Sequence, residues 1–306
     1  MKLSAVILNF KTYDKTIDCI NRLEKSVKKI NHIIIVDNNS QNKSLEIIND
    51  YLISNDKKPE ILNDINKFKN RKYLLYQNSK NTGYAKGNNI GIEIAMRLHS
   101  DYTIILNNDI KIHPDAIGKI AEFIKDEEKI GCAGPLIEEG NSLDFNFARK
   151  RLKWYDHILL SWIVKVALPF KALRKHHYIA YNEIPDNPFQ VDMISGSFML
   201  FPTEVLEKIK GFDPNTFLYF EEAIICEKLR KHRFETYVVP SSIVEHEHAG
   251  TIKKINSDQI LRHSLNSQFY YLNKVRGYNS KISHILMIGQ YITYLGSLLF
   301  NQMEKK

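Results

Sequence analysis

The chain has 306 residues, of which 43% are hydrophobic and 25% are charged, a composition that excludes disordered, collagen-like and low-complexity chains. The length predicts about two domains, or one large α/β domain with additions. Lysine and arginine outnumber aspartate and glutamate by 43 to 35, an excess of 8 that permits binding to phosphates, nucleic acid or an anionic membrane and selects none of them.

The chain begins with a short hydrophobic run, Leu3–Leu8, and charged residues follow from Lys11 onward. A secretory signal needs about 7–15 hydrophobic residues and a cleavage site with small residues, so the run predicts a buried strand instead. The cysteines are odd in number, widely spaced and without a CxxC, which argues against a disulfide framework or a cysteine zinc site. We therefore expect a reducing compartment. The cysteines are Cys19, Cys132 and Cys226.

Strand-like runs alternate with helical segments over the first 135 residues. Nearly continuous hydrophobic strands separated by helices predict a parallel sheet covered on both faces, in a Rossmann-like α/β layer. The expected strands are Leu3–Asn9, His32–Asp37, Tyr73–Gln77, Tyr102–Leu106 and Ile130–Ala133. The expected helices cover about 17–27, 44–53, 84–98 and 114–125, the last opening at Pro114.

Asparagine and aspartate follow three of these strands. Ligands of such sheets bind beyond the carboxyl ends of the strands, so these residues are candidates for a binding site. Each of them alone is also explained as a turn or helix-capping residue. The segments are Asn9-Phe10, Asp37-Asn38-Asn39-Ser40 and Asn107-Asn108-Asp109.

The chain has neither a GxGxxG after the first strand nor a GxxxxGK[ST], which argues against a dinucleotide oxidoreductase and a P-loop NTPase. Gly83, Gly87 and Gly91 are four residues apart and would form one smooth helix face, which predicts close packing on the sheet, most clearly for Gly91. Alternatively, Thr82-Gly83 would bring backbone amides and Lys86 to a phosphate.

Residues 149–177 contain eight lysines and arginines and one acid, Asp156, a net charge of +7. Trp154 and Trp162 lie here beside the hydrophobic run Ile158–Val164, which is too short to span a bilayer. This composition suits a helix lying on an anionic leaflet. A solvated basic loop over a small satellite core is the alternative.

The segment Ile282–Met303 contains no charged residue. Its pattern predicts an amphipathic helix that is docked or interfacial rather than membrane-spanning. The hydrophobic side carries Ile285, Ile288, Ile292, Leu295 and Leu299, and the polar side carries Gln290, Thr293, Ser297 and Asn301.

The second half of the chain adds a strand over 192–200, interrupted at Ser195-Gly196-Ser197, and a helix that runs from about Glu221 to Lys231. A last strand near Thr236–Val239 precedes the segment Val244–Thr251.

Taken together, the motifs resemble family 2 glycosyltransferases with the GT-A fold, most closely the rhamnosyltransferase-like branch. The resemblance covers about residues 3–251, and it rests on six motifs in the order and spacing of the family. They are Val6–Phe10, Val36–Ser40, Asn81–Asn89, Leu106–Asp109, Phe217–Glu222 and the segment around His246.

This resemblance implies a Rossmann-like mixed sheet flanked by helices, with a basic helical insertion and a C-terminal helical extension. Residues 1–135 would form the nucleotide-sugar-binding half and 191–252 the acceptor and catalytic half of the same domain. Residues 136–190 would form the basic amphipathic insertion. Residues 253–306 would form a helical segment that either inserts in a membrane or packs on the domain.

A divalent cation, Mn²⁺ or Mg²⁺, is also implied, because the family binds one at a DxD motif after the fourth strand. The equivalent here is Asn107-Asn108-Asp109, so Asp109 is the one full-strength ligand of the motif. Carboxylate and diphosphate oxygens suit such a cation, which stabilises the departing diphosphate. The resemblance adds a histidine ligand, His246 or His248.

The acidic pair of the family falls on Glu221 and Glu222, and Glu222 takes the place of the general base that deprotonates the acceptor hydroxyl. Direct displacement by that hydroxyl implies inversion without a covalent intermediate. Two positions later the family has an aspartate, where this chain has Ile224. On the residues alone, both glutamates are also explained as first-turn acids favoured by the helix dipole.

Asp37 resembles the family residue that accepts a hydrogen bond from uracil or thymine, which implies a UDP- or dTDP-sugar donor. The residues implied in binding the donor are Asn9, Asp37, Asn39, Gly83, Lys86, Asn89, Asn107, Asn108 and Gly196.

The expected function is inverting, metal-dependent hexosyl transfer to a hydroxyl of a growing, lipid-linked cell-surface glycan. The expected place is the cytoplasm, with peripheral association with the inner face of the cell membrane. Two alternatives stay open: a catalytically inactive glycan-assembly subunit, suggested by Asn107 and Ile224, and a sugar nucleotidyltransferase, which would want a glycine-rich N-terminal loop. Nucleic-acid binding is not expected, since the basic charge gathers in 149–177 instead of lining a groove.

Overall fold

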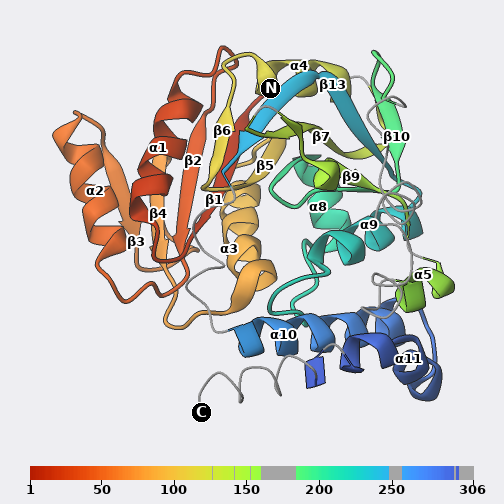
Figure 1. The fold of residues 1–306 in the computed structure, drawn as a ribbon. Coiled ribbons are helices and arrows are strands. Elements are labelled where there is room, and N and C mark those ends of the chain that lie inside the picture. The colour runs from red at the N-terminus through yellow and green to blue at the C-terminus, as the bar shows by residue number, and fades with distance from the viewer. Residues whose placement is uncertain are drawn as a thin grey trace.

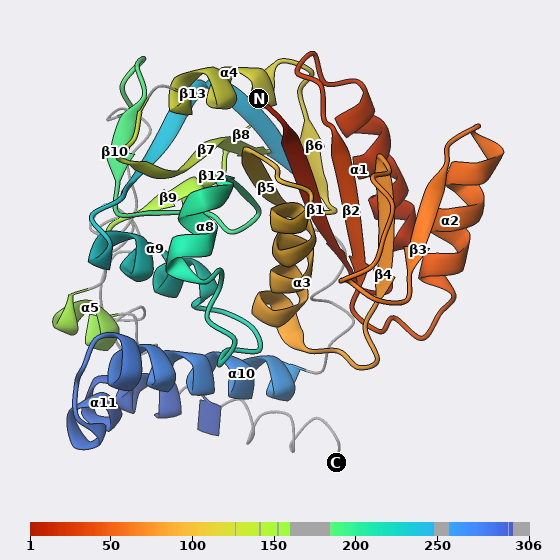
Figure 2. The ribbon, with the colours of Figure 1, turned by 180° about the vertical axis from the view of Figure 1, so that it is seen from behind.

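The structure is a computed structural model that describes residues 1–125, 127–140, 142–151, 153–159, 184–247, 257–292 and 294–295. Its centre is a mixed sheet flanked by helices, and a group of C-terminal helices lies beyond one end of the strands (Figure 1). The view from behind shows the same two parts (Figure 2).

One sheet contains eleven strands of the described chain, in the order β10-β13-β7-β12-β5-β1-β2-β4-β3, with β6 paired to β13 and β8 to β7. The strands are β1 (Leu3–Asn9), β2 (His32–Asp37), β3 (Pro59–Leu62), β4 (Tyr73–Gln77), β5 (Tyr102–Asn107), β6 (Ile110–Ile112), β7 (Ile130–Glu139), β8 (Ser142–Leu143), β10 (Phe189–Val191), β12 (Phe198–Pro202) and β13 (Glu235–His246). Two further strands, β9 (Ala148–Arg149) and β11 (Met193–Ile194), pair with each other.

The helices of the α/β part are α1 (Tyr13–Glu24), α2 (Ser44–Ser54), α3 (Gly83–Arg97), α4 (Ala116–Ile124), α8 (Thr203–Ile209) and α9 (Glu221–Lys231). Those beyond the end of the strands are α5 (Trp154–Leu159), α10 (Ser257–Tyr270), a π-helical turn (Tyr271–Val275) and α11 (Ser280–Leu286). Within the described ranges, none of the helices combines the length and the hydrophobicity that a bilayer span requires.

The five strands expected in the first half are confirmed, because their buried, hydrophobic residues leave no other structure for them. The expected parallel order is confirmed for these strands, and the sheet as a whole is mixed. β1, β2, β3, β4 and β5 are parallel neighbours, but β12 from the second half lies between β5 and β7 and is antiparallel to both. The chain therefore completes its sheet with a strand about 60 residues after β7.

Other differences are local. The helix expected from Pro114 begins at Ala116, because His113–Asp115 forms a turn in which the Ala116 amide donates to His113 O. The last strand is longer than expected and reaches His246. Of the basic insertion, α5 is a helix as expected, and 160–183 lie outside the described residues, as do Leu299 and most of the polar side expected for the C-terminal helix.

Helix α3 packs directly on β1 through glycines. A Cβ atom built on Gly91 would lie 2.2 Å from Val6 Cγ1, and one built on Gly87 would lie 2.5 Å from Leu8 Cδ1. These distances are shorter than any real contact, so a side chain added at either position must displace the Val6 or Leu8 side chain or the helix itself. The prediction of a smooth, close-packed face is confirmed for these two glycines.

We predict that Gly91→Ala lowers the free energy of unfolding by about 1 kcal/mol or more, because the overpacking exceeds the gain in helix propensity. Gly118→Ala on α4 is the matched control, since its nearest neighbour would be 3.7 Å away, and it should leave stability equal or higher. Urea unfolding midpoints measure both. Equal midpoints for the two variants would contradict the close packing.

Candidate functional site

The ends of β1 and β2 carry a buried polar cluster. Asn9 Nδ2 donates to Asp37 Oδ1 at 2.7 Å and to Ser40 Oγ at 3.2 Å. The Ser40 amide donates to Asp37 Oδ2 at 3.0 Å, and the Ser40 hydroxyl donates to Asp37 as well. Asp37 is 1% exposed, and a buried carboxylate needs such donors. The cluster therefore determines how the chain leaves both strands.

Asn108 ties the loop after β5 to this cluster. Its Nδ2 donates to Thr12 Oγ1 at 2.8 Å and to Thr16 Oγ1 at 2.9 Å. The Thr16 hydroxyl in turn donates to Asn9 Oδ1 at 2.9 Å. The three polar strand ends thus meet at one edge of the sheet, as predicted. The roles of Asn9 and Asn108 visible here are structural.

Asn38, the second residue of the segment that follows β2, fastens β2 to the start of α3. Its Oδ1 accepts the Thr82 amide at 3.1 Å, while the Gly83 amide donates to Asn81 Oδ1 at 3.0 Å and the Tyr84 amide to Phe217 O at 3.0 Å. Protein acceptors thus occupy these amides in this structure, and the predicted contact of Thr82-Gly83 with a phosphate stays a prediction.

Gly83 has another reason to be glycine. Its φ is +83°, and a Cβ atom would lie 2.3 Å from Phe217 O, so the loop before α9 can approach only a residue without a side chain.

Asn89 holds a turn in the second half of the chain. Its Nδ2 donates to Phe212 O and its Oδ1 accepts the Phe212 amide, both at 2.8 Å. The carboxamide is thereby engaged with the backbone, and its predicted contact with the donor stays a prediction. Lys86 is exposed on α3, and Asn39 is half-buried with a φ of +60°.

Asp109 and His246 come together as predicted for two metal ligands. Asp109 Oδ1 and His246 Nε2 are 3.3 Å apart, and both side chains are about one-tenth exposed. Asp109 Oδ1 is buried and accepts no hydrogen bond from the described residues. Within those residues no group of three or more potential ligands gathers. The predicted alternative ligand, His248, lies outside the described residues.

This pair fits a divalent cation that also binds the diphosphate. Mg²⁺ and similar cations take few protein ligands and complete their shell with phosphate oxygens and water. His246 Nε2 and Asp109 Oδ1, which lie 3.3 Å apart, could be the two protein ligands of such a cation.

Glu221 and Glu222 begin α9, next to the interrupted strand 193–202. A Cβ atom on Gly196 would lie 2.9 Å from both Cγ and Oε1 of Glu222, so this glycine leaves room for the Glu222 side chain. The Asn107 amide donates to Ser197 O at 2.9 Å. The loop with Asp109 is therefore joined directly to the segment on which Glu222 packs.

The two glutamates have different surroundings. Glu221 is 5% exposed, and its burial, together with the neighbouring Glu222 charge, raises the pKa of Glu221 to about 8. The side chain of Glu222 is 26% exposed. Glu221 is therefore protonated at neutral pH, and Glu222 is the member of the pair that can meet an acceptor.

Two features of this acidic pair were not predicted. Tyr219 and Phe220, just before α9, have φ values of +72° and +67°, a strained conformation for residues with side chains. Arg149 on β9 places an amino nitrogen 3.9 Å from Glu222 Oε2, and its Nε is buried without a hydrogen-bond partner among the described residues. Only the basic composition of 149–177 pointed to Arg149.

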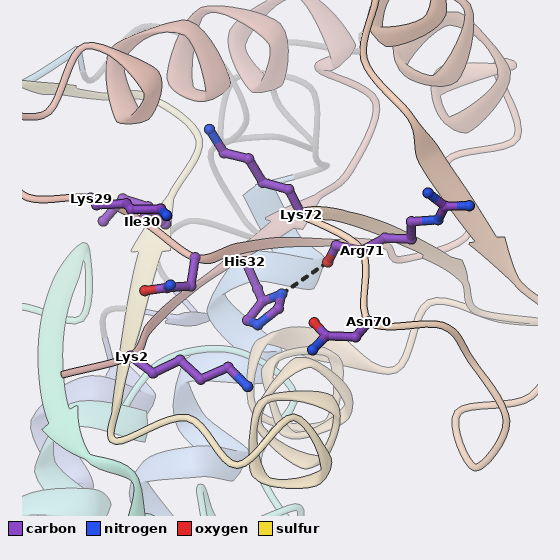
Figure 3. A pocket seen from close by; sticks show the side chains of 8 residues that line it. Lys2, Lys29, Ile30, His32, Asn70, Arg71 and Lys72 are labelled. Carbon is purple, nitrogen blue, oxygen red and sulfur yellow. Dashed lines mark hydrogen bonds between the residues drawn. The ribbon is translucent and has the colours of Figure 1, made fainter.

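A cavity of about 380 Å³ lies at the opposite end of the strands (Figure 3). Lys2, Lys29, Arg71 and Lys72 line it, with His32, whose Nδ1 lies 2.9 Å from Arg71 O. None of the predicted site residues belongs to it.

Comparison with known proteins agrees with the motifs. A sequence model described as "Glycosyltransferase like family 2" matches residues 34–264. The N-acetylglucosaminyl-diphospho-decaprenol L-rhamnosyltransferase of Mycobacterium tuberculosis (strain ATCC 25618 / H37Rv) is 23% identical over 180 residues, which are 58% of this chain and 57% of that protein. The match thus spans little more than half of the curated relative.

Solved structures with the same fold include GalNAc-T7 with UDP, GalNAc and Mn²⁺, at a TM-score of 0.58 and 14% identity, covering 95% of this chain and 54% of that one. The mannosyltransferase PcManGT from Pyrobaculum calidifontis, in complex with GDP-Man and Mn²⁺, has a TM-score of 0.57 at 9% identity, covering 97% and 74%. S. aureus TarS 1-349 in complex with UDP-GlcNAc has a TM-score of 0.54 at 12% identity, covering 94% and 70%.

We predict that the stability of the protein falls as the pH rises from about 4.5 to about 8, because Glu221 releases its proton earlier in the unfolded chain than in the folded one. Glu221→Gln, which keeps the neutral form, should reduce this loss by on the order of 2 kcal/mol. Urea unfolding at pH 5 and pH 8 measures it.

Glu207→Gln, on an exposed glutamate of α8, is the control and should behave as the wild type. If Glu221→Gln and the wild type lose the same stability over this pH range, Glu221 is not held neutral by the fold.

Proposed function

The chain belongs to glycosyltransferase family 2, and on that premise we propose that it transfers a sugar from a UDP- or dTDP-sugar to a hydroxyl group of a growing glycan, with inversion. Membership confirms the family resemblance of the motifs, and the mixed sheet confirms the GT-A fold. The observation that carries the proposal is the Asn107–Ser197 hydrogen bond, which brings the Asp109 loop against the segment that supports Glu222.

Asp37 would recognise the base of the donor. Its two oxygens accept hydrogen bonds from Asn9 and Ser40, and the lone pairs that remain can accept the imide N–H of uracil or thymine. Two of the three solved structures hold UDP or UDP-GlcNAc.

Asp109 and His246 would hold a divalent cation. Bound there, the cation would offset the charge that develops on the leaving diphosphate. Two of the solved structures of this fold were obtained with Mn²⁺, which supports Mn²⁺ or Mg²⁺ in this role.

Glu222 would act as the general base toward the acceptor hydroxyl. Burial keeps the neighbouring Glu221 protonated, so one negative charge of the pair remains, on the more exposed side chain. An amino nitrogen of Arg149 lies 3.9 Å from this carboxylate, close enough to help to orient it. The two glutamates thus divide into a structural neutral acid and a catalytic base.

A lipid-linked saccharide would be the acceptor, at the cytoplasmic face of the membrane. The support is the rhamnosyltransferase relative, whose name specifies an N-acetylglucosaminyl-diphospho-decaprenol substrate. A catalytically inactive assembly subunit is the second candidate, favoured by the amide of Asn107 in place of the first carboxylate of the metal motif.

We predict that UDP- or dTDP-sugars with Mn²⁺ raise the melting temperature by about 3–6 °C, whereas GDP-sugars do not. Asp109→Asn should abolish the part of this shift that needs Mn²⁺, while Asp50→Asn, on an exposed residue of α2, should keep it. A thermal-shift panel measures this. Stabilisation by GDP-sugars alone would contradict the role of Asp37.

We also predict that Glu222→Gln lowers sugar transfer and donor hydrolysis by about 10²–10⁴-fold, with the donor-induced thermal shift unchanged, because only the proton acceptor is lost. Glu207→Gln is again the control. A wild-type protein that binds donor but neither transfers nor hydrolyses it would establish the inactive subunit instead.

A further inference from the structure

Six of the ten exposed large hydrophobic side chains in the described chain lie on α5 and on the C-terminal segment 280–295, of which the structure describes 280–292 and 294–295. Their exposed fractions run from 41% to 58%. α5 contacts α11, and both views show the two side by side, next to α10 (Figures 1 and 2). We call these six residues the outer hydrophobic face: Trp154, Ile282, Ile285, Ile288, Ile292 and Leu295.

The other side of segment 280–295 is already packed on the protein. Leu286 and Met287 are buried, and Gln290 Nε2 donates to the backbone oxygen of His157 on α5 at 3.0 Å. The isoleucines are therefore exposed even though the segment is packed against the protein through its other side. Several large hydrophobic side chains that stay exposed on two contacting elements, outside a completed packing contact, indicate an interaction surface.

The charges around this face select its partner. Residues 259–303 contain four cations and no acid. Among them Lys274 and Lys281 are exposed, and exposed Lys153 directly precedes Trp154. Branched hydrophobic residues with a tryptophan and lysines are the composition of helices that lie in the interface of an anionic bilayer. A second copy docked face to face would bring these cations together, so a lipid leaflet is the favoured occupant.

The face is coupled to the catalytic end of α9. On α10, the Ser267 hydroxyl donates to Leu218 O at 2.8 Å, and His263 stacks on Phe217 with ring centroids 4.2 Å apart. Leu218 lies three residues before Glu221. The same helical group therefore borders both the outer face and the loop that leads into the acidic pair.

Buried Glu227 makes this connection firm. Arg151 donates to it through two nitrogens at 2.6 and 2.9 Å, and Arg276, beyond the π-helical turn, lies 3.8 Å away. The Glu227 carboxylate thus connects α9 to Arg151, in the segment between β9 and α5, and to Arg276, in the C-terminal helical group.

We propose that the outer hydrophobic face binds an anionic lipid leaflet. Bound in this way, the protein would hold the Glu221–Glu222 end of α9 close to the membrane surface, where a lipid-linked acceptor lies. The exposed hydrophobic residues and the nearby cations favour a lipid leaflet over other partners. That the leaflet also brings the acceptor to Glu222 rests on the proposed function.

The test uses the full chain and sedimentation with vesicles of phosphatidylcholine, alone or with about 30% of the anionic lipid phosphatidylglycerol. Wild-type protein should bind the anionic vesicles at least about tenfold more tightly than the neutral ones. Ile285→Ser/Ile288→Ser should weaken that binding by about tenfold or more, because it removes the centre of the face.

Ile53→Ser/Ile61→Ser is the matched control, since it changes two equally exposed isoleucines elsewhere and should bind as the wild type. Equal melting temperatures show that both variants fold. Wild-type protein that ignores anionic vesicles, or a face variant that binds them normally, overturns the proposal. So does a concentration-dependent dimer that the face variant abolishes, because the occupant is then a second copy.

Donor hydrolysis in vesicle-free solution separates this proposal from the proposed function. Unchanged hydrolysis in Ile285→Ser/Ile288→Ser, together with lost vesicle binding, supports a docking role alone. Absent hydrolysis in every variant, the wild type included, counts against the enzyme activity and leaves the vesicle result to decide the docking surface.

Discussion

The structure depends on satisfying polar groups that are buried at the carboxyl ends of the strands. Asn9, Asn38 and Asn108 are almost fully enclosed, and each carboxamide donates or accepts across two different elements. An unpaired amide there would cost more than most single contacts contribute, so these hydrogen bonds must form together. Their shared outcome is a rigid edge from which Asp37 and Asp109 project at defined places.

Much of the fold was predictable, because strands such as β1 and β2 are hydrophobic on both faces and only a covered parallel sheet buries them. The place of β12 was not, since a pattern within five residues carries no information about which distant strand it will join. At the site, the motifs of the family pointed to Asp109, His246 and Glu222 as candidates, which residue types alone would not have done. They did not separate Asn89, which fastens a turn, from an asparagine that binds ligand, because both use the same amide.

The different burial of the two acidic residues could not be predicted from the sequence. Glu221 and Glu222 are alike in sequence, yet one side chain turns into the protein and the other stays near the surface. Desolvation then assigns them different charges at the same pH. Two consecutive left-handed residues, Tyr219 and Phe220, precede them, so the orientation of the pair is maintained against local backbone preference by the surrounding packing.

The position of β12 has a consequence for biosynthesis. When the ribosome has released the first 135 residues, β5 has no partner on one side and β7 has no attachment to the parallel strands. Both must wait until residue 202 has emerged, so the nascent chain carries open strand edges while more than 60 further residues are made. Residues 1–135 are therefore not a separable module, and a shortened gene that ends near residue 135 would yield a fragment with unpaired strand edges that is prone to aggregate.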